Sequence, residues 1–201
     1  MKIILATSNN GKVKEIAELF KDEEVLPYGE VVKPFHIEES GEDFAANALI
    51  KARAVFEKLP KGSGSIVLSD DSGISVPLLG GEPGIYSARY AGKGASDREN
   101  LNKLVEELKR RGVKQTPAFY TAAIAIVSPE AEYVVHGWMH GMVVDKPRGD
   151  GGFGYDPIFI PEDYDKTLGE LSPEIKREIS HRAKALSLAM PIVKMLRSIY
   201  E

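Results

Sequence analysis

Residues 65–73 are a run of strand-forming residues followed by two adjacent carboxylates: Ser65-Ile66-Val67-Leu68-Ser69-Asp70-Asp71-Ser72-Gly73. Two like charges one residue apart repel each other, so a metal ion, a lysine or a proton has to offset them. Side chains alternate along an extended chain, so we expect Asp70 and Asp71 to point to opposite sides of the strand end. The alternative is a solvated turn, because Asp, Ser and Gly are the usual residues of turns.

The composition is that of an ordinary globular protein. The 201 residues fit one domain, residues 1–201, without a separable linker. A net charge of −4 offers no global reason to bind nucleic acid. The absence of cysteine excludes disulfides, thiolate zinc sites and cysteine nucleophiles. No run approaches the roughly 20 apolar residues of a membrane span, and no signal peptide is evident, so we expect a cytoplasmic protein without membrane contact.

The N-terminal segment has the pattern of a strand, a polar turn and a helix. Residues 2–6 are strand-like, and apolar residues with helical spacing begin at Val13. Between them lies the turn Thr7-Ser8-Asn9-Asn10-Gly11-Lys12. A helix N-terminus that follows such a turn presents backbone N–H groups to an anion, and Lys12 adds a positive charge. The alternative is a plain connection with an Asn or Ser cap.

Two further regions have a predicted secondary structure. A long helix is predicted over residues 44–59, with Asn47 and Lys51 one turn apart on a face of their own. Alone, Lys51 would be a solvated lysine, and Glu39 a carboxylate at a helix start. The β-rich residues 118–127 and 133–144 are expected to form an antiparallel pair.

The stretch 147–161 is rich in glycine and contains an aromatic residue that suits base stacking. Glycines let the backbone approach a ligand closely, and Phe153 among them suits stacking on a planar base. The alternative is a flexible hairpin loop. Further along the chain, Lys176, His181 and Arg182 form a small cationic cluster that would, in isolation, be solvated helix residues.

Five motifs together resemble one family, the inosine/xanthosine triphosphate pyrophosphatases, which remove non-standard purine nucleotides from the precursor pool. The resemblance runs from about residue 2 to about residue 196, and the motifs occur in the family's order at compatible spacing. They are residues 7–12 (TSNNGK), 69–73 (SDDSG), 83–89 (PGIYSAR), 151–157 (GGFGYDP) and 180–182 (SHR).

The resemblance implies an elongated α/β fold with two lobes, a central mixed β-sheet flanked by helices, and an active-site cleft between the lobes. It implies a homodimer that hydrolyses ITP, dITP or XTP to the monophosphate and pyrophosphate with Mg²⁺. Asp71 would be the catalytic carboxylate, and Glu39 and Asp71 would bind the metal. Substrate would be bound by Thr7, Ser8, Asn9, Asn10, Gly11, Lys12, Lys51, Ser72, Phe153, Gly154, Tyr155, Asp156, Lys176, His181 and Arg182.

The chemistry of these residues agrees with that assignment. Mg²⁺ prefers one or two carboxylates plus phosphate oxygens and water, which suits Glu39 and Asp71. Asp71 would also accept the proton of the attacking water, with Asp70 in a supporting place. Arg182 would recognise the O6 and N7 acceptors of 6-oxo purines, whereas adenine presents N7 and an amino donor at position 6. Two alternatives are a pyrophosphatase for modified pyrimidine nucleotides and a nucleotide-binding module without turnover.

Overall fold

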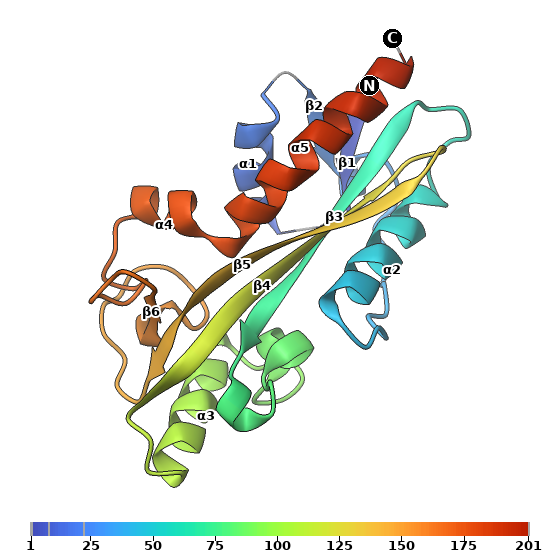
Figure 1. Cartoon of the computed structure of the whole chain (residues 1–201). Coiled ribbons are helices and arrows are strands. Elements are labelled where there is room, and N and C mark those ends of the chain that lie inside the picture. The colour runs from blue at the N-terminus through green and yellow to red at the C-terminus, as the bar shows by residue number, and fades with distance from the viewer. Residues whose placement is uncertain (1, 8, 22, 201) are drawn as a thin grey trace. The chain divides into compact units, whose positions relative to one another are not determined.

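The computed structural model of the chain describes residues 2–7, 9–21 and 23–200 (Figure 1). The helices and strands follow in the order β1 (Lys2–Leu5), α1 (Asn10–Leu19), β2 (Glu24–Pro27), α2 (Phe44–Phe56), β3 (Ser65–Ser75), α3 (Asp97–Arg110), β4 (Gln115–Val127), β5 (Glu132–Val144), β6 (Phe159–Pro161), α4 (Pro173–Ile179) and α5 (His181–Tyr200). No helix in these described ranges has the length and apolar character needed to cross a bilayer.

The six strands form one mixed sheet in the order β2-β1-β3-β4-β5-β6. β1 pairs in parallel with β2 and β3, whereas β5 and β6 are antiparallel. The predicted α/β class with a mixed sheet flanked by helices is therefore confirmed. The turn at residues 69–73 is not formed, because β3 continues through both aspartates to Ser75.

The chain divides into two compact units. Unit 1 contains residues 1–71, 122–137 and 184–201, and unit 2 contains residues 72–121 and 138–183. β3, β4 and β5 each contribute residues to both units.

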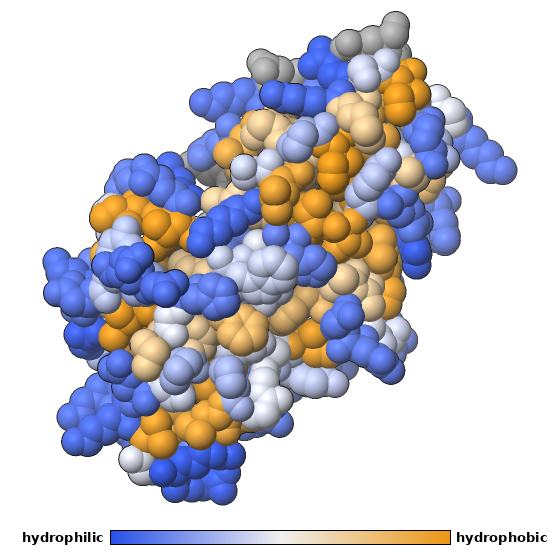
Figure 2. Space-filling model, in the orientation of Figure 1, coloured by the Kyte–Doolittle hydropathy of each residue, from blue (hydrophilic) through white to orange (hydrophobic). Residues whose placement is uncertain are grey.

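Unit 1 has a separate hydrophobic core on each face of its strands. Side chains of a strand alternate between the two faces. In β3, Ile66 and Leu68 pack with α1 and α5, whereas Val67 packs with α2. Figure 1 shows α1 and α5 on one side of these strands and α2 on the other. The outer face of α5 exposes Leu188, and hydrophobic residues gather along this helix in Figure 2.

Unit 2 is built around α3, which packs its apolar stripe on the strands of this unit. Leu104 and Leu108 of α3 lie in one core with Ile74 of β3 and Tyr120 of β4. The helix begins at a capping box, in which the Ser96 and Glu99 side chains each bond to the other residue's backbone N–H. This anchored N-terminus places Asp97 at the first helical position, where it contacts the glycine-rich loop described below.

Candidate active site

The two aspartates of β3 point to opposite faces of the sheet, and each is paired with a lysine from the helix on that face. The Nζ of Lys12, in the first turn of α1, lies 2.5 Å from Oδ2 of Asp70, whose side chain is 1% exposed. The Nζ of Lys51, on α2, lies 2.7 Å from Oδ1 of Asp71. The strand alternation predicted from the sequence is therefore confirmed, and lysines offset both carboxylates of the pair.

Lys51 also connects Asp71 to the second predicted metal ligand. Its Nζ lies 3.5 Å from Oε2 of Glu39, so one cation faces two carboxylates. Burial raises the pKa of Asp71 to about 6, the Lys51 ammonium opposes that rise, and the charges of Glu39 and Asp70 add to it. A carboxylate with a pKa close to neutrality is suited to accept and release protons at cellular pH.

The polar turn before α1 is held together by hydrogen bonds among its own residues. The Asn9 N–H donates to Oγ1 of Thr7 (3.1 Å), and the Lys12 N–H donates to Oδ1 of Asn9 (3.2 Å). Asn9 thus caps the helix, as the alternative reading expected. Asn10 and Gly11 form the first helical positions, and Ser8 lies outside the described residues. Phosphate binding by this turn remains a prediction.

Three of the predicted residues in unit 2 lie together at the glycine-rich loop. Asp156 is buried, accepts a hydrogen bond from the Phe153 N–H (2.8 Å) and is paired with the Lys176 ammonium. Burial raises the pKa of Asp156, and Lys176 opposes that rise. The same ammonium lies 4.1 Å from the centroid of the Phe153 ring, which is 59% exposed. The Phe153 ring is exposed and contacts the Lys176 ammonium, so it is available for stacking.

Two other residues of this loop are placed by structural contacts. The Gly154 N–H donates to Oδ2 of Asp97 on α3 (3.0 Å). The Tyr155 ring is buried in the core of unit 2, and its hydroxyl donates to the Ser87 carbonyl (2.8 Å). Tyr155 therefore supports the loop from inside. Asp97 was not among the predicted residues, because nothing in the sequence connects a helix start to a loop 57 residues away.

The remaining predicted residues of unit 2 lie at the start of α5 and on β3. The buried His181 ring stacks on Tyr120, with 4.8 Å between centroids and 13° between planes. The Arg182 guanidinium donates to Oγ of Ser72 (3.3 Å). The structure therefore brings Arg182 and Ser72 together, 110 positions apart in the chain.

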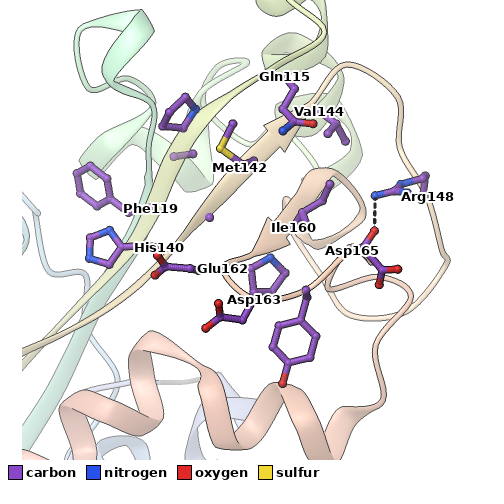
Figure 3. A pocket seen from close by; sticks show the side chains of 15 residues that line it. Gln115, Phe119, His140, Met142, Val144, Arg148, Ile160, Glu162, Asp163 and Asp165 are labelled. Atoms are coloured by element: carbon purple, nitrogen blue, oxygen red, sulfur yellow. Dashed lines mark hydrogen bonds between the residues drawn. The ribbon is translucent and has the colours of Figure 1, made fainter.

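A separate cavity of about 700 Å³ lies in unit 2, on the face of β4 and β5 beside the segment that follows β6 (Figure 3). None of the predicted site residues that the structure describes lines it. Its lining includes the carboxylates of Glu162, Asp163 and Asp165 against a single guanidinium, that of Arg148. Its lining therefore carries an excess of negative charge.

Solved structures with the same fold identify the class of α/β protein to which this chain belongs. The Ham1 protein of Staphylococcus aureus is 37% identical with a TM-score of 0.86, covering 96% of this chain and 98% of the other. A HAM1 protein from Coxiella burnetii is 38% identical with a TM-score of 0.86, covering 97% and 99%.

The family model described as the Ham1 family matches residues 3–192, and the chain belongs to this family. A relative from Nautilia profundicola, named dITP/XTP pyrophosphatase, is 60% identical over 98% of this chain and 100% of its own length. A relative of the same name from Sulfurimonas denitrificans is 62% identical over 98% and 100%.

Proposed function

We propose that this chain hydrolyses the non-standard purine nucleotides ITP, dITP and XTP to the monophosphate and pyrophosphate. The observation that carries the proposal is the position of the Lys51 ammonium between Asp71 and Glu39. It is supported by relatives of 60–62% identity that bear the name dITP/XTP pyrophosphatase. In this proposal the whole chain is one catalytic domain and acts in the cytoplasm, where its substrates arise.

Glu39 and Asp71 are the residues that would hold Mg²⁺. Both carboxylates already face one cation, the Lys51 ammonium, and two carboxylates are the usual protein contribution to a magnesium site completed by phosphate and water. Bound there, Mg²⁺ would neutralise phosphate charge and lower the pKa of a water molecule.

The chain's own residues would then perform the proton transfer and stabilise charge. Asp71 accepts the proton of the attacking water, a task for which its pKa of about 6 is suited. Lys51 and Lys12 come from two helices and supply fixed positive charges for the triphosphate. Asp70 holds Lys12 in place through a buried ion pair.

The residues of unit 2 would recognise the base and the rest of the nucleotide. Phe153 offers an exposed ring for stacking, and Asp156 and Lys176 fix the loop that carries it. Arg182 can donate two hydrogen bonds to O6 and N7 of hypoxanthine or xanthine, whereas adenine presents an amino donor at position 6. His181 would stay stacked on Tyr120 beside Arg182 and fix the start of α5.

A panel of nucleotides with Mg²⁺ tests the proposed reaction. ITP, dITP and XTP are expected to yield the monophosphate and pyrophosphate, with ATP and GTP turned over far more slowly. Ion chromatography separates pyrophosphate from orthophosphate, and release of orthophosphate would contradict the proposal. Preferential turnover of dTTP or UTP would favour the pyrimidine alternative, and tight binding of ITP without products would favour a binding module.

We also propose that the protein is a homodimer. The proposal is supported by an apolar strip on α5, where Leu188, Met195 and Ile199 are exposed. These residues lie seven and four positions apart and therefore on one side of the helix. Light scattering during size-exclusion chromatography is expected to give twice the chain mass of 22.0 kDa.

The pH dependence of turnover is expected to report the ionisation of Asp71. At the lowest Mg²⁺ concentration that supports turnover, kcat/KM for ITP should decline as the pH falls below about 6, because protonated Asp71 cannot accept a proton. Added Mg²⁺ favours the carboxylate and should move this decline to lower pH. Both effects are measured by assaying pyrophosphate release at a series of pH values and Mg²⁺ concentrations. A decline whose midpoint does not shift with the Mg²⁺ concentration would be assigned to a group other than Asp71.

A further inference from the structure

The segment that carries Glu39 has no helix or strand of its own. The residues from the end of the turn at 28–32 to the start of α2 at Phe44 are without regular secondary structure. A metal ligand on such a segment needs contacts that fix its position, because a ligand is useful only within a fraction of an ångström of its place. The contacts that fix Glu39 are therefore of functional interest.

The segment is attached to α2 two residues after Glu39. The Gly41 N–H donates a 2.8 Å hydrogen bond to Oδ1 of Asn47, and the Asp43 carboxylate caps the helix by accepting from the Ala46 N–H (2.7 Å). Because the Gly41 N–H is a donor, the amide oxygen of Asn47 must be the atom that faces it. Asn47 lies one turn before Lys51 on the same helix, so the segment is joined to the helix that carries the cation between Asp71 and Glu39.

Gly41 is the residue that allows this close approach. A Cβ atom at Gly41 would lie 2.7 Å from Cβ of Ala46 and 2.8 Å from both the backbone nitrogen and Oδ1 of Asn47. Two of these three atoms belong to a helix backbone or its first side-chain carbon, which cannot move without moving α2. Any larger residue would therefore push the segment away from the helix and break the hydrogen bond.

Asparagine is an energetically unfavourable residue at position 47. Its side chain is 0% exposed, and its Nδ2 donor is buried without an acceptor among the described residues. A buried donor without an acceptor destabilises the folded state, and a leucine of similar size would not incur this penalty. The Asn47 side chain nevertheless provides Oδ1, which accepts the hydrogen bond from the Gly41 N–H.

We propose that Asn47 is a positioning residue for the metal site, and that its hydrogen bond to Gly41 holds Glu39 where it can act together with Asp71. This inference rests on the proposed function, in which Glu39 binds the metal. Residues that orient metal ligands typically change metal affinity about 10–100-fold when they are removed.

The test measures binding of Mn²⁺ to the full chain, with electron paramagnetic resonance of the free ion as the readout and without any turnover. Asn47→Leu and Gly41→Ala break the same hydrogen bond from its two ends, and each is expected to weaken Mn²⁺ binding about tenfold or more. The double variant should lose little beyond either single variant, because the two residues share one interaction.

Val55→Ala is the matched control, because Val55 is a fully buried residue of the same helix that lies in the core with Ala48 and Ala52. It is expected to lower the thermal midpoint of unfolding while Mn²⁺ affinity stays at the wild-type value. Wild-type affinity in both Asn47→Leu and Gly41→Ala would overturn the inference while leaving the proposed reaction intact. Absence of Mn²⁺ binding by the wild-type protein, both alone and with the monophosphate product IMP present to supply phosphate oxygens, would instead overturn the metal role of Glu39 and the inference with it.

Discussion

Asp71→Asn is expected to lower kcat for ITP by at least about 10³-fold while the protein remains folded. Removal of a general base typically costs 10²–10⁴-fold, and this substitution also removes a charge proposed to hold the metal. Folding should tolerate it, because Asn has the same shape and removes a carboxylate whose burial opposes ionisation. Steady-state kinetics and the thermal midpoint of unfolding, measured on the same preparation, separate the two effects.

The neighbouring aspartate supplies the control for this experiment. Asp70→Asn makes the same chemical change one residue away, on the opposite face of β3, where it leaves Lys12 without its ion-pair partner. We expect a smaller loss of kcat than for Asp71→Asn, because Asp70 holds Lys12 and adds to the raised pKa of Asp71 but does not itself accept the proton. Near-normal activity of Asp71→Asn together with an inactive Asp70→Asn would transfer the catalytic role to Asp70.

The geometry of the two aspartates could be predicted from the sequence because strand alternation depends only on the local backbone. The sequence also identifies Lys12 and Lys51 as the cations, but it does not say which lysine meets which carboxylate. That pairing depends on which face of the sheet each helix covers. α1 packs on the face of Ile66 and Leu68, and therefore of Asp70, whereas α2 packs on the face of Val67. The packing of α1 and α2 on opposite faces of the sheet therefore determines which lysine pairs with which aspartate.

Other parts of the site could not be predicted because they depend on contacts between distant segments. The SDDSG stretch has the composition of a turn, yet β3 continues through it to Ser75, beyond the residues 65–68 that pair with β1. β4 is the other neighbour of β3 in the sheet, and Lys12 and Lys51 offset the two carboxylates of the extended chain. The contact of Asp97 with Gly154 and the hydrogen bond of Tyr155 to Ser87 join segments 57 and 68 residues apart. No local pattern of residues encodes such contacts.

Arg182→Ala is expected to raise KM for ITP and to reduce the preference for ITP over ATP by roughly tenfold to 100-fold. A bidentate contact between arginine and the O6 and N7 of a purine is worth about 1–3 kcal/mol of discrimination, and each 1.4 kcal/mol is tenfold. The reason lies in the geometry of the guanidinium, whose planar fork can direct two parallel N–H donors at O6 and N7. The measurement is kcat/KM for both nucleotides, with an unchanged ITP:ATP ratio as the result that would remove Arg182 from base recognition.

Arg182→Lys separates the shape of the side chain from its charge. Lysine keeps the positive charge at the start of α5 but lacks the planar fork that makes two parallel hydrogen bonds. If Arg182 recognises the base, Arg182→Lys should lose most of the same discrimination as Arg182→Ala. If Arg182 acts only as a fixed charge near the phosphates, the lysine variant should keep the wild-type ratio. Arg177→Ala, which removes an exposed guanidinium from α4, is the control for the loss of charge alone and should leave the ITP:ATP ratio unchanged.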